Sequence, residues 1–202
     1  MSNEIAPKNP KRKLLLLAAL MLTPVMISYL LFFSEVRPGS VNYGELIEVK
    51  PLLGTALNHS DHTIFRIRQL RGKWALLMVD SGTCDEPCRK KLYHMRQVRL
   101  VQHTEKNRVE RVWLIDDDVA PESSIIEEYK GTWLINAKDS ELVKEVPAAV
   151  SPRDHIYLVD PLGNVMLRFP KNVDPAGMVK DIKRLLKVSQ IEHALGSPEM
   201  RH

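Results

Sequence analysis

The sequence predicts an α/β domain preceded by a single transmembrane helix. Two observations carry this prediction: an uncharged apolar run at residues 14–33, and two short apolar runs at residues 74–80 and 111–116, each followed by a helical pattern. A short, continuously apolar run bounded by turn residues is typical of a strand buried on both faces of a sheet. The expected order is therefore a membrane helix followed by alternating strands and helices.

The length and charge of the chain limit its architecture and its partners. A chain of 202 residues has room for one compact domain plus an appendage. Residues 1–13 hold four basic side chains against one acidic side chain, which accounts for three of the four net positive charges. The remainder of the chain is almost neutral, so we expect no nucleic-acid partner.

Residues 14–33 are expected to anchor the chain in a membrane. Twenty helical residues rise about 30 Å, enough to cross a bilayer core, and membrane helices tolerate a proline such as Pro24. Lys11, Arg12 and Lys13 precede the run, so the positive-inside rule predicts that residues 1–13 are cytoplasmic. We expect a single-pass protein of the bacterial inner (cytoplasmic) membrane with a periplasmic C-terminal domain. A cleaved signal peptide is the alternative, but its apolar core is shorter.

The exported part is expected to comprise a linker at residues 34–44, a folded domain at residues 45–190 and a loose tail at residues 191–202. The pattern predicts these elements in order: an edge strand at 63–70, a strand at 74–80, a helix from Pro87 to about Lys106, a strand at 111–116, a helix opened by Pro121, a short apolar segment at 133–135, helical turns at 140–146, a hairpin of 155–160 with 165–169, and a last helix capped by Asp174. A crossover between parallel strands, then an antiparallel hairpin and a terminal helix, is thioredoxin-like topology.

Cys84 and Cys88 are the two cysteines of the chain, and they lie where the first buried strand gives way to a helix. A helix N-terminus stabilises thiolates and lowers thiol pKa values. Pro87 fits the first helical turn, which puts Cys88 in that turn and Cys84 in the loop before it. Asp85 and Glu86, between the cysteines, are assigned no role.

The spacing of the two cysteines leaves several chemistries open. Residues i and i+4 of a regular helix are too far apart for an unstrained disulfide, but a loop position for Cys84 permits either a disulfide or a shared soft metal. Two thiolates suit Cu(I), and an added imidazole makes a good three-coordinate site. Zinc would want four ligands, and no further cysteine exists.

With these residues in place, the chain resembles the Sco/SenC family of copper-binding cytochrome oxidase assembly factors, which are thioredoxin-like. The matching segments are the N-terminal anchor, residues 42–44, residues 72–77, the Thr-Cys-x-x-x-Cys motif at 83–88, Pro121 with Tyr129, and residues 154–163. The resemblance implies copper, as Cu(I) or Cu(II), held by Cys84, Cys88 and His155. It also implies a partner, the copper-binding subunit of a cytochrome oxidase.

The chain departs from the Sco/SenC pattern at two positions. Arg89 stands where family members typically have a proline after the second cysteine. The family histidine usually lies a few residues further ahead of the Pro-x-Gly turn than His155 does. The alternative for His155 is a strand-end histidine hydrogen-bonded to the backbone.

Three hypotheses for function follow. In the first, which we favour on sequence, the chain is a copper-handling assembly factor and not an enzyme. In the second, it is a thiol–disulfide oxidoreductase acting on another periplasmic thiol protein, with Cys84, expected to be the more exposed, as the attacking thiol and Cys88 resolving the mixed disulfide. In the third, it is a non-catalytic anchored module with a structural disulfide.

Overall fold

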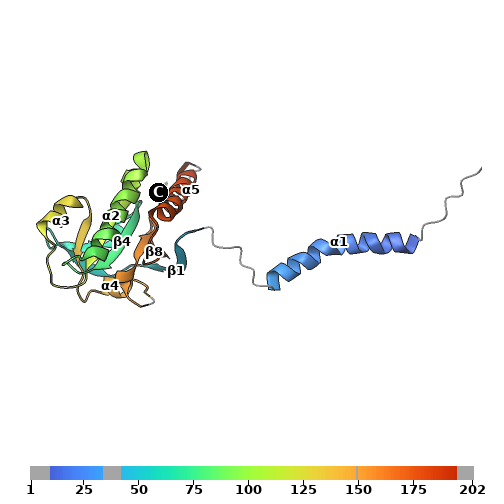
Figure 1. Ribbon diagram of the computed structural model, residues 1–202, viewed down its shortest axis with the longest axis horizontal. Helices are drawn as coiled ribbons and strands as arrows, with labels where there is room; N and C mark the ends of the chain where they lie inside the picture. Colours follow the sequence, from blue (N-terminus) through green and yellow to red (C-terminus); the bar gives the residue numbers. More distant parts are fainter. Residues whose placement is uncertain (1–9, 34–41, 149, 195–202) are drawn as a thin grey trace, which may run out of the picture. The chain divides into compact units, whose positions relative to one another are not determined.

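The computed structural model describes residues 10–33, 42–148 and 150–194, in two compact units that are described separately. The first unit contains helix α1 (Pro10–Phe33), with Pro24 inside it (Figure 1). Its span Lys11–Leu30 has a mean hydropathy of 1.9, and none of its most apolar stretch is buried. By length and composition this one N-terminal helix is able to cross a membrane, which agrees with the expected anchor at residues 14–33. Residues 1–9, the linker residues 34–41 and the tail residues 195–202 lie outside the described part.

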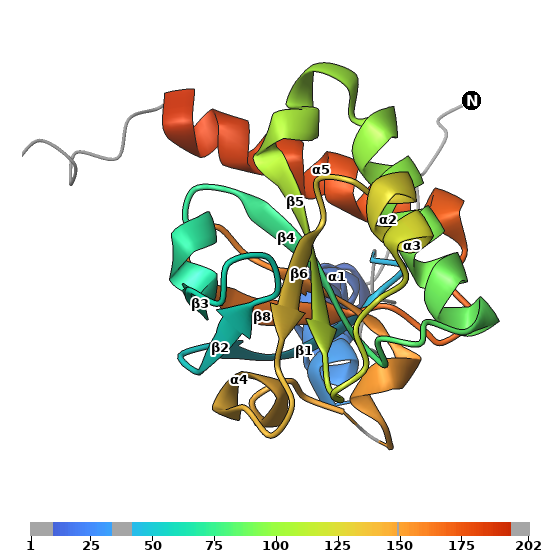
Figure 2. The same ribbon diagram turned by 90° about the vertical axis from the view of Figure 1, so that its left-hand side faces the viewer.

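The second unit is built on a mixed sheet whose strands run in the order β1-β8-β7-β4-β5-β6-β2-β3 (Figure 2). The parallel pairs are β4 with β5 and β5 with β6, and the other pairs are antiparallel. The strands are β1 (Glu45–Pro51), β2 (Thr55–Asn58), β3 (Ile64–Arg66), β4 (Trp74–Asp80), β5 (Val109–Ile115), β6 (Trp133–Asn136), β7 (Ile156–Val159) and β8 (Asn164–Arg168).

Helices cover both faces of this sheet. The helical segments of the domain are η1 (Ile67–Leu70), α2 (Glu86–Val101), η2 (His103–Arg108), α3 (Ser123–Glu128), α4 (Glu141–Lys144), η3 (Pro152–Asp154) and α5 (Pro175–Ala194). Side chains of α2, α3 and α5 pack on one face, and side chains of η1 and α4 pack on the other. The domain thus has three layers, with a hydrophobic core on each side of the sheet.

Strand β4 is the centre of the domain because all seven of its residues are buried. Its side chains alternate between the two cores, as strand geometry requires. Trp74, Leu76 and Met78 enter the core beneath α2 and α5, while Ala75, Leu77 and Val79 enter the opposite core. The predicted strand at 74–80 is therefore confirmed residue for residue. Packing on both faces of the sheet fixes the position of its C-terminal end.

The predicted α/β, thioredoxin-like fold is confirmed, with differences at the edges of the domain. Strands β1 and β2 were not predicted, because most of their side chains are exposed and show no apolar alternation. The predicted strand at 63–70 divides into β3 and η1. Helix α5 continues to Ala194, into the predicted tail, since no glycine or proline occurs between Gly177 and Gly196.

Three residues of the predicted linker, 42–44, are part of the folded domain. The backbone N–H groups of Tyr43 and Gly44 donate to the buried carboxylate of Asp181 at 3.1 and 2.8 Å. The Tyr43 ring lies so close to Gly177 of α5 that an added Cβ there would be 2.4 Å from it. These contacts hold the start of the domain against its last helix.

Candidate functional site

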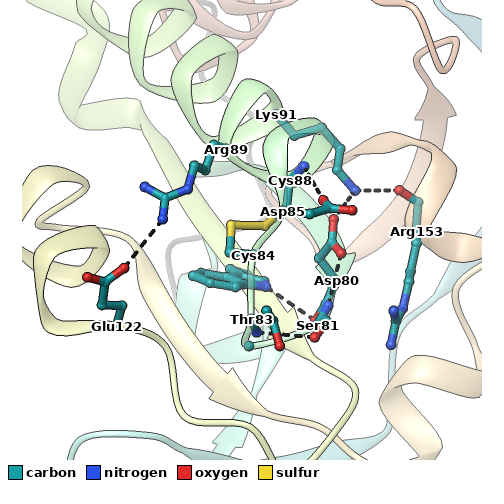
Figure 3. The surroundings of a disulfide bond; sticks show 12 residues. Asp80, Ser81, Thr83, Cys84, Asp85, Cys88, Arg89, Lys91, Glu122 and Arg153 are labelled. Atoms are coloured by element: carbon teal, nitrogen blue, oxygen red, sulfur yellow. Dashed lines mark hydrogen bonds and ion pairs between the residues drawn. A yellow bond between two sulfur atoms is a disulfide. The ribbon is translucent and has the colours of Figure 1, made fainter.

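The cysteine loop joins the end of β4 to the start of α2 by a tight turn (Figure 3). The backbone N–H of Cys84 donates to the Ser81 carbonyl at 3.1 Å, and that of Thr83 donates to the Ser81 hydroxyl at 3.1 Å. Cys84 has φ of +46°, in the left-handed region that residues other than glycine seldom occupy. Such backbone strain is often found at functional sites, and here it turns the chain into the helix.

Cys84 and Cys88 form a disulfide, with their Cα atoms 5.0 Å apart. The loop position of Cys84 makes this bridge possible, in agreement with the sequence interpretation. Both residues are buried, at 1 % and 0 % exposure, so the expected greater exposure of Cys84 is not found. An attacking sulfur atom therefore reaches the bridge only when the covering side chains move.

Asp85 caps helix α2, a role that the sequence interpretation missed. Its side chain accepts a hydrogen bond from the backbone N–H of Cys88 at 3.1 Å, and the helix begins at Glu86, one residue before the expected Pro87. An aspartate just ahead of a proline in the first turn is the signal that could have identified the cap. Because the Asp85 carboxylate accepts the Cys88 backbone N–H, it lies beside Cys88 and opposes a negative charge there.

A buried ion pair lies beside the disulfide. Lys91 Nζ is 2.6 Å from Asp80 Oδ2, and both side chains are about nine-tenths buried. Lys91 also donates to the backbone carbonyl of Val79 and to that of Arg153, the second of which is drawn in Figure 3. Sequence reasoning did not identify this pair, although a carboxylate ending an apolar strand just before the cysteine motif was a visible signal.

The three consecutive acids after β5 bind different neighbours, and one of them holds the cysteine loop. Asp116 makes a two-point ion pair with Arg153, at 2.8 and 2.7 Å, and Asp118 pairs with Lys138. Asp117 accepts the backbone N–H of Gly82 at 3.0 Å. Each acid thus has its own partner, as expected for a strand-end loop.

Gly82 is required where the two loops meet. A Cβ added there would lie 1.7 Å from the Val119 carbonyl oxygen, a distance that no side chain tolerates. Asp117 also accepts from the backbone N–H of Val119 at 3.1 Å. Burial raises the pKa of Asp117, but the hydrogen bonds from Ser81, Gly82 and Val119 outweigh it, so its pKa lies below the usual value.

His155 lies between η3 and β7, and its ring is directed at the neighbouring strand end. Nδ1 is 2.8 Å from the Phe169 carbonyl oxygen, and the ring meets Tyr157 edge-on at 6.0 Å between centroids. A histidine that donates Nδ1–H to a carbonyl keeps Nε2 free to accept. This is the geometry expected of the alternative, a strand-end histidine bonded to the backbone.

The predicted copper ligands fit a metal only in part. A disulfide offers no thiolate, although a reduced Cys84–Cys88 pair would supply two soft donors suited to Cu(I). Within the described residues, no group of three or more His, Cys, Asp or Glu side chains is placed to hold a metal ion. The structure therefore brings the two cysteines together and does not group His155 with them.

Fold and site define a class: a thioredoxin-like protein with a cysteine pair at the N-terminus of the helix that follows a central strand, preceded by an apolar helix. Residues 74–189 match the family model described as "Transmembrane-like, thioredoxin-like, C-terminal domain". The chain belongs to this family. The family description and helix α1 together indicate a membrane anchor.

Solved structures with the same fold include Sco proteins, which agrees with the Sco/SenC resemblance at the level of fold. Copper-bound yeast Sco1 is 20% identical, with a TM-score of 0.53 over 68% of this chain and 94% of that one. Copper-bound ScoI of Bradyrhizobium japonicum is 16% identical, with a TM-score of 0.50 over 68% and 99%. Apo Sco1 of Thermus thermophilus is 16% identical, with a TM-score of 0.53 over 75% and 99%. No curated protein matches the chain.

The buried ion pair yields a stability prediction. Lys91→Met leaves the Asp80 carboxylate buried without its partner, which we expect to lower the free energy of unfolding by about 3 kcal/mol. Asp80→Asn combined with Lys91→Met removes both charges and is expected to cost clearly less than the sum of the single variants. Urea unfolding of the oxidised domain, residues 41–202, measures both effects. Additive single and double effects would show that the two side chains are not coupled.

Proposed function

We propose that this protein is a membrane-anchored thiol–disulfide exchange protein whose Cys84–Cys88 pair cycles between disulfide and dithiol. The observation that carries the proposal is the placement of the pair. The two cysteines are bridged in a strained loop between a central strand and the N-terminus of α2, in a thioredoxin-like fold. A helix N-terminus favours the thiolate form that exchange requires.

The exchange has a defined electron balance. The thiolate of one cysteine, Cys84 in our assignment, attacks a sulfur atom of the partner's disulfide and forms a mixed disulfide, releasing the partner's other sulfur as a thiolate. Cys88, after losing its proton, attacks Cys84 and releases the second partner thiolate. Two electrons pass to the partner, and the Cys84–Cys88 disulfide is restored. A dithiol protein then supplies the two electrons that reduce it again.

The anchor supports a place for this chemistry outside the cytoplasm. Lys11, Arg12 and Lys13 lie at the N-terminal end of the apolar helix, which favours a cytoplasmic N-terminus in a bacterial inner membrane. The domain would then be periplasmic, where disulfides form and persist. Its partner would be another periplasmic thiol protein.

A second candidate function is copper handling in the assembly of a respiratory cytochrome oxidase. Two observations favour it: the fold similarity to copper-bound Sco structures, and a pair of cysteines that becomes a soft two-thiolate donor when reduced. The partner would then be the copper-binding subunit of the oxidase. His155 would add a nitrogen ligand to the copper only if its ring moved away from the Phe169 carbonyl, or if Nε2 and not Nδ1 bound the metal. We place thiol exchange first because the described residues contain no group of three side chains placed to hold a metal ion.

Exchange is tested with a synthetic peptide that contains an intramolecular disulfide, mixed with the reduced full chain in detergent micelles. The wild type should reduce the peptide completely. Cys88→Ser should stop at a one-to-one adduct detected by mass, because the resolving thiol is absent. Cys84→Ser should react at least about tenfold more slowly, since Cys88 lies beside the Asp85 carboxylate, which disfavours its thiolate.

The variant lacking both cysteines, Cys84→Ser with Cys88→Ser, is the matched control and should form no adduct. If the reduced wild type leaves the peptide disulfide intact, the exchange function is refuted. Equal adduct formation by the two single variants would refute the assignment of Cys84 as the attacking thiol.

Copper binding is tested by anaerobic Cu(I) titration of the reduced full chain. The copper hypothesis predicts one Cu(I) per chain and loss of tight binding in Cys84→Ser and in Cys88→Ser. His155→Ala separates the two ligand sets: weaker binding supports a three-ligand site, and unchanged binding supports two thiolates alone. If neither cysteine variant alters the affinity for copper, the copper hypothesis is refuted.

A further inference from the structure

A cavity of about 450 Å³ opens beside the disulfide. All three residues between the cysteines, Asp85, Glu86 and Pro87, line it. The remaining walls come from Asp80 at the end of β4, the next turns of α2, η3 and residues 171–173 before α5. A molecule in this cavity therefore touches the loop that must open when the disulfide exchanges.

The acidic side chains of the cavity are largely occupied by partners within the protein. Asp80 is paired with Lys91, Asp154 lies 2.8 Å from Lys171 Nζ, and Asp85 accepts the backbone N–H of Cys88. Glu86 is the exception, and it is exposed at the first residue of α2. Few hydrogen-bond acceptors thus remain to receive a cationic ligand.

The donors of the cavity are less fully used. His94 is 7 % exposed, and neither of its ring nitrogens has a hydrogen-bond partner within the described residues. A buried polar group of this kind costs free energy unless a ligand or water satisfies it. Lys90 is exposed, lines the same cavity one turn earlier on α2, and forms no ion pair within the described part. Lys171 is largely exposed and keeps further N–H groups beyond its bond to Asp154.

The charge state of His94 suits a hydrogen-bond donor. Burial lowers the pKa of His94, and the charge of Lys90 lowers it further, against a smaller opposite effect of Asp174. The imidazole is therefore neutral at pH 7 and keeps one N–H to donate. A negative charge brought between Lys90 and His94 is favoured by both groups.

We propose that this cavity binds a carboxylate of the thiol compound that exchanges with Cys84–Cys88, through Lys90 and His94. This inference rests on the proposed exchange function and names the chemistry of its partner. The carboxylate belongs either to a small thiol acid or to a side chain near a cysteine of a partner protein. In both cases the cavity holds the partner's charge while its sulfur atom faces the cysteine loop.

Binding is tested apart from exchange in the full chain carrying Cys84→Ser and Cys88→Ser, in detergent micelles. N-acetylalanine, a carboxylate without a thiol, should shift the ring NMR signals of His94 saturably, and N-acetylalanine amide should not. Lys90→Met should abolish the shift, whereas Lys187→Met, which changes an exposed lysine of α5, should preserve it. No saturable shift, or an equal one in Lys90→Met, overturns the carboxylate site whether or not the cysteines exchange.

The consequence for exchange is measured as the rate at which thiols reduce the Cys84–Cys88 disulfide in the otherwise native chain. The rate with N-acetylcysteine, divided by the rate with its amide, should fall about fivefold in Lys90→Met and in His94→Gln, and stay unchanged in Lys187→Met. A matched pair of cysteine peptides, one with glutamate and one with glutamine near the cysteine, repeats the comparison for a protein source. A change in the N-acetylcysteine ratio supports a small thiol acid as the source of the carboxylate. A change in the peptide ratio alone supports a side chain of a partner protein. Unchanged ratios in both series overturn the proposal.

Discussion

The junction between β4 and α2 is the constraint on which the rest of the site depends. Strand β4 is buried along its whole length, so its last residue and the first residue of the loop have fixed positions. The loop must then reverse direction between the sheet and the helix in five residues, 81–85, against the acid loop that follows β5. Gly82 fits because it has no Cβ, Cys84 accepts a left-handed backbone, and Asp85 starts the helix. The disulfide is the covalent result of this tight turn, which also keeps both sulfur atoms covered.

The charges around this junction are paired with one another or with backbone groups. Asp80 and Lys91 neutralise each other beneath the loop, so neither imposes a net charge on the sulfur atoms. Asp117 and Asp116 tie the loop and η3 to the end of β5. The cysteines are thus held by neutral pairs and backbone hydrogen bonds, and the helix N-terminus is the main remaining influence on a thiolate at Cys84.

The sequence was sufficient to predict the central elements, because their signals are local. Six consecutive apolar residues, 74–79, define most of β4, and Pro87 places the cysteines at a helix start. The ion pair of Asp80 with Lys91 was beyond local reasoning, since it depends on how α2 lies over the end of β4. The same holds for His155, whose ring direction follows from the pairing of β7 with β8 and the position of the Phe169 carbonyl. Strands β1 and β2 escaped prediction because most of their side chains are exposed, so too few buried positions remain to show an apolar alternation.

The central claim is that Cys84–Cys88 is a redox-active pair and not a fixed structural bridge. Its most direct test is the reduction potential of the pair in the full chain, measured by equilibration with thiol–disulfide buffers of known potential. Our account predicts a value above about −300 mV, within the range of thiol-exchange proteins. A value clearly below about −300 mV would identify an inert structural disulfide and contradict the account.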